Sequence, residues 1–185
     1  MKSQFLEQEI TYDGTQLRSH WIYETAGVKE DAIVAFIGPC QVDLTHMVDL
    51  EDVVAKKHIY SLSMLHFISE QFDSDLEKMI LRQRLFVSLM QAELVESQPD
   101  EKFVRKGDDL FLEHYKLSVS IATASPISTL LHVGINISSR DTPVPTKGLE
   151  DFGLNPVAFA WSVMNRYVDE LRGVHWARCK VRGVS

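Results

Sequence analysis

Two short segments in which apolar residues occupy every second position place the strongest constraint on the fold of this chain. They are residues 116–121 (KLSVSI) and 131–137 (LHVGINI). Because successive side chains of a β-strand point to opposite faces, this period predicts two strands, each with an apolar and a polar face. Ser125 and Pro126 lie between the segments and predict that they pair as a hairpin.

The predicted polar face of this hairpin carries mostly small side chains. Its residues, in chain order, are Lys116, Ser118, Ser120, His132, Gly134 and Asn136. The missing side chain of the glycine would leave room for a ligand against the sheet, surrounded by hydrogen-bonding groups and one ammonium. The alternative is an antiparallel sheet whose second face is simply exposed to water, a common arrangement that requires the same alternation.

The rest of the chain contains helical and extended patterns without a repeat or a linker, so we expect one domain over residues 1–185. Three alternating runs between 108 and 138 predict a meander of strands, and further strands are expected at 9–12, 31–38 and 174–181. Apolar residues at helical spacing predict helices at 64–68, 76–90 and 157–171. The last helix is expected to begin at Pro156 and to end at Gly173.

Composition excludes several classes of function. The chain has 19 Lys and Arg against 26 Asp and Glu, a net charge of −7, which disfavours broad nucleic-acid binding. Only a local patch near the C-terminus could bind nucleic acid, formed by Arg166, Arg172, Arg178, Lys180 and Arg182. No apolar stretch is long enough to span a membrane and no export signal is present, so we expect a cytoplasmic protein.

Motifs for nucleophilic hydrolysis and for common nucleotide-binding loops are missing. The sequence has no Gly-x-Ser-x-Gly elbow, and neither Gly38-Pro39 nor Gly107-Asp108 begins a phosphate-binding loop. Cys40 and Cys179 lie in no CxxC motif or catalytic signature, so reduced thiols are the simplest interpretation.

The whole chain resembles a family known as domain of unknown function 366, through residues 12–20 (YDGTQLRSH), 46–52 (HMVDLED) and 177–182 (ARCKVR). A more distant resemblance links Asp109-Leu, Lys116-Leu-Ser118 and Gly134-Ile-Asn136 to biotin and lipoate protein ligases, which carry similar strands in this order. This second resemblance implies an α+β fold: a mixed, largely antiparallel sheet with helices mainly on one face, as in class II synthetases.

The ligase resemblance also implies site residues and cofactors. Lys116 would contact a carboxylate and its activating phosphate, and Asp109 with Mg²⁺ would organise the phosphates of ATP. Ser118, Gly134 and Asn136 would line the pocket. This chemistry is reasonable, because a fixed ammonium stabilises negative charge at phosphorus in a site with little water.

One part of the ligase pattern is missing, because the chain has no Gly/Arg-rich loop of the kind that closes over an adenylate. Arg18, Arg82 and Arg84 are therefore the candidates for binding phosphate, since a guanidinium pairs with phosphate or carboxylate through two hydrogen bonds. The alternative is that these arginines lie on solvated helix faces or in ion pairs with nearby acids.

Histidine spacing raises a metal-site hypothesis. His20 with Glu24 and His66 with Glu70 lie four residues apart, which on a helix places both side chains on one face. Neither pair has a third ligand nearby, so helix-surface contacts are the simpler interpretation. Acidic residues 49–52 follow His46, and they equally predict a helix N-terminus, where carboxylates meet the positive end of the helix dipole.

The sequence thus supports a leading hypothesis and two others. The first is a ligase-like pocket that binds a nucleotide or small carboxylate and adenylates a carboxyl group. The second is a non-catalytic small-molecule binding or assembly protein that keeps the fold, and the third is a structural homodimer. The sequence also leaves open whether residues 138–153 form a lid or a connection.

Overall fold

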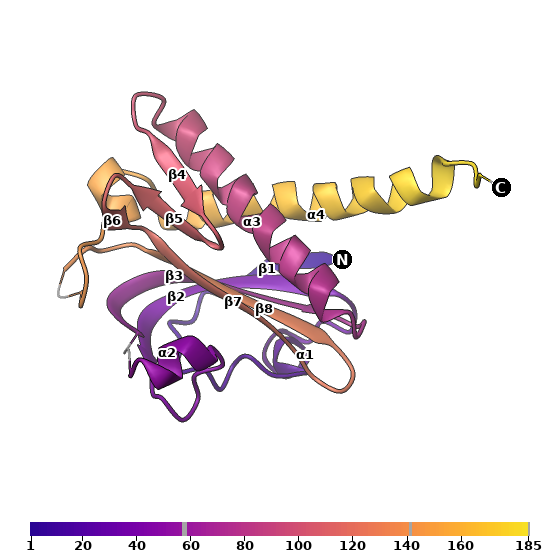
Figure 1. Cartoon of the computed structure of the whole chain (residues 1–185), viewed down its shortest axis with the longest axis horizontal. Coiled ribbons are helices and arrows are strands. Elements are labelled where there is room, and N and C mark those ends of the chain that lie inside the picture. Colours follow the sequence, from indigo (N-terminus) through magenta and orange to yellow (C-terminus); the bar gives the residue numbers. More distant parts are fainter. Residues whose placement is uncertain (57–58, 141, 185) are drawn as a thin grey trace.

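The computed structural model describes residues 1–56, 59–140 and 142–184, and its centre is a five-stranded sheet in the order β1-β2-β3-β8-β7 (Figure 1). These strands are β1 (Lys2–Phe5), β2 (Ala32–Val42), β3 (Ile59–Gln71), β7 (Ser118–Ala124) and β8 (Thr129–Asn136). Among these described strands, only β1 and β2 pair in parallel. The predicted mixed, largely antiparallel sheet is therefore confirmed.

A smaller sheet and two long helices complete one side of the molecule. The small sheet contains β4 (Phe103–Lys106), β5 (Asp109–Leu112) and β6 (Tyr115–Lys116), and the helices are α3 (Leu76–Ser97) and α4 (Pro156–Lys180). Both helices pack on the same face of the large sheet, as Figure 1 shows. Their apolar residues and the short 3-10 helix η1 (Leu149–Phe152) form the larger core.

The opposite face of the large sheet is covered by residues 6–20, which follow β1, and by two short helices. These helices are α1 (Trp21–Ala26) and α2 (Leu50–Val54), and Figure 1 shows both on the far side of the sheet from α3. Tyr12 and Trp21 pack there on alternate residues of β2 and β3, in a second core. The sheet is consequently buried on both faces.

This double burial explains why the predicted helix at 64–68 is wrong. Met64 to Gln71 belong to β3, the central strand, and all of them are buried. A strand that is covered on both faces has no alternation of polar and apolar residues, so its pattern cannot be distinguished from that of a buried helix.

Other boundaries also differ from those predicted. The strand expected at 9–12 is only a bridge between Tyr12 and Cys40, and the true first strand is β1. The predicted strand at 174–181 is wrong, because α4 continues through Gly173 to Lys180. Gly173 does not adopt the left-handed conformation that ends many helices. The end of α4 therefore projects beyond the body (Figure 1).

The described helices include none that is long and apolar enough to cross a bilayer. The predicted helix start before residue 50 is confirmed, because the Asp49 side chain accepts hydrogen bonds from the N–H groups of Glu51 and Asp52 at the N-terminus of α2.

Candidate functional site

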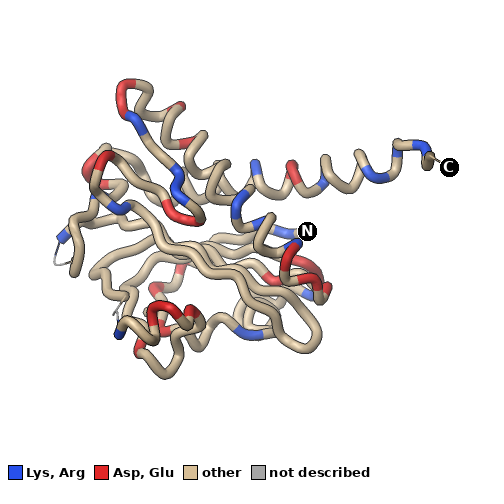
Figure 2. Tube along the Cα trace, viewed as in Figure 1, with Lys and Arg blue, Asp and Glu red and all other residues tan. Residues whose placement is uncertain are grey.

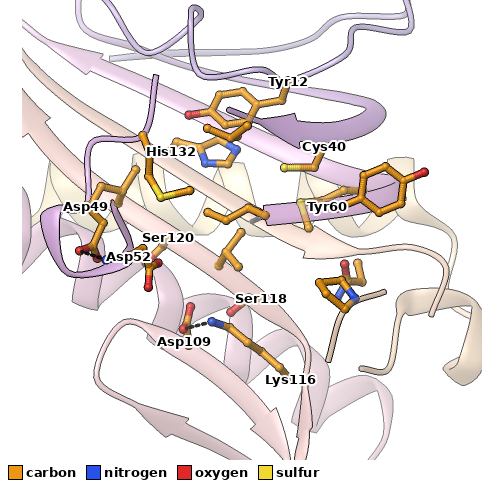
Figure 3. A pocket seen from close by; sticks show the side chains of 18 of the residues that line it. Tyr12, Cys40, Asp49, Asp52, Tyr60, Asp109, Lys116, Ser118, Ser120 and His132 are labelled. Carbon is orange, nitrogen blue, oxygen red and sulfur yellow. Dashed lines mark hydrogen bonds and ion pairs between the residues drawn. The ribbon is translucent and has the colours of Figure 1, made fainter. Parts of the chain in front are cut away.

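A cavity of about 440 Å³ opens on the α2 side of the sheet, beside the edge strand β7. Its walls come from β2, β3, β7 and β8, from the segment 46–52, from residues 108–109 and 116, and from the loop 142–146. The volume lies within the range of small-molecule sites. Figure 3 shows Tyr12 and His132 on one side of this pocket and Asp109 and Lys116 on the opposite side.

Lys116 and Asp109 form an ion pair at the pocket. Nζ of Lys116 lies 2.6 Å from Oδ2 of Asp109, and the two side chains are 32% and 19% exposed. β5 and β6 are paired strands of the small sheet, which holds the two residues close together. The structure thus brings together the two residues to which the ligase resemblance assigned separate roles, and the described pocket residues include no other Lys or Arg.

Burial dominates the environment of the Asp109 carboxylate. Desolvation raises its pKa above the ordinary value, Lys116 opposes that rise, and the charges of Asp108 and Asp52 add to it. Oδ1 of Asp109 is buried and has no hydrogen-bond partner among the residues that the structure describes. The pocket therefore contains an acceptor that a cation or a ligand donor would satisfy.

The pocket carries more negative than positive charge. Its described acidic residues are Asp49, Asp52, Asp108 and Asp109, against the ammonium of Lys116. Figure 2 shows acidic positions on the segment that includes α2, and Asp49 and Asp52 of this segment line the pocket. A free triphosphate would meet more repulsion here than a single carboxylate at Lys116 or a metal-bound phosphate group would.

The predicted pocket face is wrong for two serines. The chain passes from the small sheet to the large one at Leu117, whose N–H donates to the Leu110 carbonyl and whose carbonyl accepts from Asn136 N–H. This break resets the alternation, so Ser118 lies opposite Ile135 and Ser120 opposite Val133, on the face that the helices cover.

Both serine hydroxyls already have protein partners. Ser118 Oγ accepts a 2.8 Å hydrogen bond from the N–H of Leu110, and Ser120 Oγ donates to the Asp108 carbonyl at 2.8 Å. Gln83 of α3 donates to Ser120 Oγ at 2.7 Å and to Asp108 Oδ2 at 3.1 Å. The serines border the pocket, but their hydroxyls join the small sheet and α3 to β7.

The space expected beside Gly134 is already filled. A Cβ built on this glycine would lie 2.3 Å from Sδ of Met64 and 3.4 Å from a methyl carbon of Val119. Met64 and Val119 line the pocket, and Gly134 does not. The glycine thus permits the methionine to lie flat against β8, and the ligand space begins beyond it.

His132 and Asn136 do face the pocket, as the alternation of β8 predicts. Both residues are buried, at 3% and 4% exposure. Within the part of the chain that the structure describes, the Asn136 side-chain amide has no hydrogen-bond partner. Its donors and acceptor are consequently available to a ligand.

His132 belongs to a stack of rings that the sequence did not reveal. Its ring lies 3.6 Å from that of Tyr12 with an interplanar angle of 6°, and its Nε2 lies 3.1 Å from Nδ1 of His66. Burial lowers the pKa of His66 to about 3 and lowers that of His132 well below its ordinary value. Both imidazoles are therefore neutral at pH 7.

The three predicted phosphate-binding arginines do not line the pocket. Arg18 forms an ion pair with Glu24, and Arg82 pairs with Asp73 at the start of α3. Arg84 lies 3.1 Å from Asp108, so it reaches the site only through that carboxylate. The ion-pair interpretation describes all three.

The described residues contain no cluster of three His, Cys, Asp or Glu side chains that could hold a metal ion. His66 and Glu70 lie on β3 instead of a helix, and Glu70 accepts hydrogen bonds from His20 N–H and Ser128 Oγ. Cys40 lines the pocket, but burial raises the pKa of its thiol to about 12, so it is not a nucleophile at pH 7.

Residues 138–153, for which the sequence left open a lid or a connection, divide into two parts. Asp141 lies outside the described residues. Thr142, Pro143, Val144 and Thr146 border the pocket, and Thr146 is bridged to the backbone of Lys116. Leu149 and Phe152 instead pack on the larger core. The first part is therefore a pocket wall, and the second part is structural.

Comparison with known proteins shows that the chain is similar to proteins that are described as uncharacterised or of unknown function. The family described as domain of unknown function (DUF366) matches residues 1–182. Uncharacterized protein MJ0805 from Methanocaldococcus jannaschii is 36% identical over 159 residues, which are 83% of this chain and 71% of that protein. A solved protein of unknown function from Pyrococcus horikoshi is 34% identical, with a TM-score of 0.92 over 100% of this chain and 99% of that one.

A more distant structural likeness confirms the ligase fold. The biotin protein ligase from Aquifex aeolicus superposes with a TM-score of 0.59 at 16% identity, covering 93% of this chain and 69% of that chain. At this identity the likeness concerns the fold, and a fold hosts many unrelated functions.

Proposed function

Because this chain belongs to the DUF366 family, whose description assigns no activity, we propose from its pocket that it binds a small carboxylate-bearing molecule. The ligand's carboxylate contacts Nζ of Lys116, and its apolar part lies over Met64 and Val119. The observation that carries the proposal is the position of Lys116: its ammonium is the one Lys or Arg group on the described pocket wall.

The balance of charge supports a monoanion. Four of the described pocket residues are aspartates, so a single carboxylate that joins Asp109 at Lys116 meets less repulsion than several phosphate charges would. The Asn136 amide and the His132 ring provide polar groups that orient the neutral part of the ligand.

Adenylation of the bound carboxylate is the second candidate, favoured by the buried, unpartnered Oδ1 of Asp109. Asp109 fits a magnesium ion that also binds nucleotide phosphates, because Mg²⁺ in such sites takes one or two protein carboxylates, whereas both carboxylate oxygens of Asp108 already contact Arg84 and Gln83. When bound, the ion would neutralise phosphate charge. Lys116 would then stabilise the charge that develops while a carboxylate oxygen bonds to the α-phosphorus and pyrophosphate leaves.

Thermal-shift screening of the purified chain tests both candidates. The probes are biotin, lipoate and other small carboxylates, ATP with Mg²⁺, and purines, because a ligand that binds only the native state raises the Tm. We expect a carboxylate to raise the Tm of the unaltered protein and of the exposed-site control Lys102→Ala, but not that of Lys116→Ala. A carboxylate shift that persists in Lys116→Ala would contradict the proposal.

Catalysis has a separate readout. If the chain adenylates its ligand, labelled pyrophosphate will exchange into ATP only when the carboxylate is present, and Asp109→Asn will abolish the exchange. Carboxylate binding without any exchange would assign the chain to the non-catalytic class.

A further inference from the structure

On the side of the pocket opposite to Lys116, uncharged side chains have hydrogen-bond donors and acceptors that the structure fixes. These side chains are Tyr12, His132 and His66, with ring centroids 3.6 Å apart for the first pair and 5.4 Å apart for the two imidazoles. All three are at most 4% exposed. Figure 3 shows His132 and Tyr12 together on the side of the pocket opposite to Lys116.

A backbone carbonyl determines which nitrogen of His66 carries the proton. Nε2 of His66 lies 3.3 Å from the carbonyl oxygen of Gly38, which can only accept a hydrogen bond. Nε2 is therefore the donor. Since a neutral imidazole has a single N–H, Nδ1 of His66 is a bare acceptor.

The same reasoning continues to His132. Its Nε2 lies 3.1 Å from the bare Nδ1 of His66, so Nε2 of His132 must donate. This leaves Nδ1 of His132 as a lone-pair acceptor. Across residues 1–56, 59–140 and 142–184, this nitrogen has no hydrogen-bond partner.

An acceptor nitrogen on a ring that lines the pocket is open to a hydrogen-bond donor from a ligand. His132 lines the pocket, and Tyr12 covers one face of its ring. A carboxylate at this position would place its own lone pairs against the nitrogen. The group that fits here is an uncharged donor, and the neighbouring Met64 and Val119 provide apolar contacts beside it.

We propose that Nδ1 of His132 accepts a hydrogen bond from an uncharged N–H group of the amide class in the ligand of this pocket. The inference rests on the proposed carboxylate-binding function and deepens it. The ligand has two distinct ends: an amide N–H group at His132 and a carboxylate at Lys116. The Gly38 carbonyl and His66 act as positioning groups, because they set the tautomer of His132 without touching the ligand.

The first test is the tautomer of each histidine in the free protein. In a long-range ¹H–¹⁵N correlation spectrum of ¹⁵N-histidine-labelled protein at pH 7, we expect both His66 and His132 to carry the proton on Nε2. A proton on Nδ1 of His132 would overturn the inference, because that nitrogen would then be a donor.

The second test uses two uncharged probes that differ only in the donor. We expect 2-pyrrolidinone to shift the Nδ1 signal of His132 upfield and N-methyl-2-pyrrolidinone, which lacks the N–H, to bind at least about tenfold more weakly, a difference of about 1.4 kcal/mol. Equal binding of the two lactams, or no binding of either at millimolar concentration, would overturn the proposal.

Variants separate this inference from the proposed function. His132→Phe keeps a ring against Tyr12 and should abolish the preference for the N–H probe, whereas His132→Asn, which keeps a side-chain acceptor, should retain part of it. Lys116→Met should leave lactam binding unchanged while it removes carboxylate binding. Loss of lactam binding in Lys116→Met, with normal binding in both His132 variants, would show that His132 is not the acceptor of the lactam N–H.

Discussion

Nζ of Lys116 lies 2.6 Å from Oδ2 of Asp109, so the one ammonium on the described pocket wall is held by a carboxylate whose other oxygen has no partner. The pair is mostly buried, and its members come from adjacent strands of the small sheet. This arrangement keeps a positive charge at the ligand side of the edge strand β7, while one oxygen of its counter-charge stays buried without a hydrogen-bond partner among the described residues.

Removal of one partner is therefore expected to cost more than removal of both. Lys116→Met should lower the free energy of unfolding by about 1–3 kcal/mol, because it leaves the Asp109 carboxylate buried without its cation. Lys116→Met combined with Asp109→Asn should recover at least half of that loss. Urea denaturation at pH 7 measures the cycle, and strictly additive losses would show that the two side chains are not coupled.

The stability of the protein is expected to fall as the pH decreases from 7 to 5. Unfolded histidine has a pKa near 6.5, whereas the pKa of His66 in the folded protein is about 3 and that of His132 is also lowered. Below pH 6.5 the unfolded chain therefore binds more protons than the native one, which favours unfolding. We expect a loss of about 1 kcal/mol for each of these histidines between pH 6 and pH 5.

Two variants check the source of that pH dependence. His66→Gln should reduce the slope of unfolding free energy against pH, whereas His175→Gln, at an exposed position on α4, should leave it unchanged. The carboxyl group of Asp73, whose pKa is lowered to about 2, titrates below this window. An unchanged slope in His66→Gln would contradict the neutral histidine pair.

Gln83 is expected to be the most important polar contact between α3 and the pocket wall. Its amide donates to Asp108 and to Ser120, and the residue is 3% exposed. Gln83→Leu should lower the unfolding free energy by about 1–3 kcal/mol, because it leaves buried polar groups without a partner. Gln91→Leu, which loses a single bond to the Phe103 carbonyl, is the control, and an equal or larger loss there would disprove this ranking.

Two glycine substitutions should have opposite effects. Gly38→Ala would place a Cβ 2.0 Å from the carbonyl oxygen of Ile10, so backbone must move, and it would displace the carbonyl that orients His66. Gly173→Ala meets open space inside α4 and should raise the unfolding free energy by up to about 1 kcal/mol. Thermal unfolding of both variants checks the prediction, which fails if Gly38→Ala matches the unaltered protein in Tm.

The sequence by itself determined the features that depend on local periodicity. The apolar alternation of β8, the long amphipathic helix α3, the capped start of α2 and the buried strand after Asp31 all follow from residues close in the chain. Lys116 and Asp109 were also identifiable, because a pattern of short motifs in a fixed order resembled the ligases. The fold class was predicted from the same evidence.

Only the tertiary structure decided which side chains share the pocket. The break at Leu117 shifts the serines of β7 to the helix-covered face. This register depends on the hydrogen bonds of Leu117 with Leu110 and Asn136, which a local sequence pattern does not predict. The double burial of β3 removed the signal that would have identified a strand. The stack of Tyr12, His132 and His66 joins residues up to 120 positions apart. The arrangement of hydrogen-bond donors and acceptors on this side of the pocket therefore exists only once the sheet has formed.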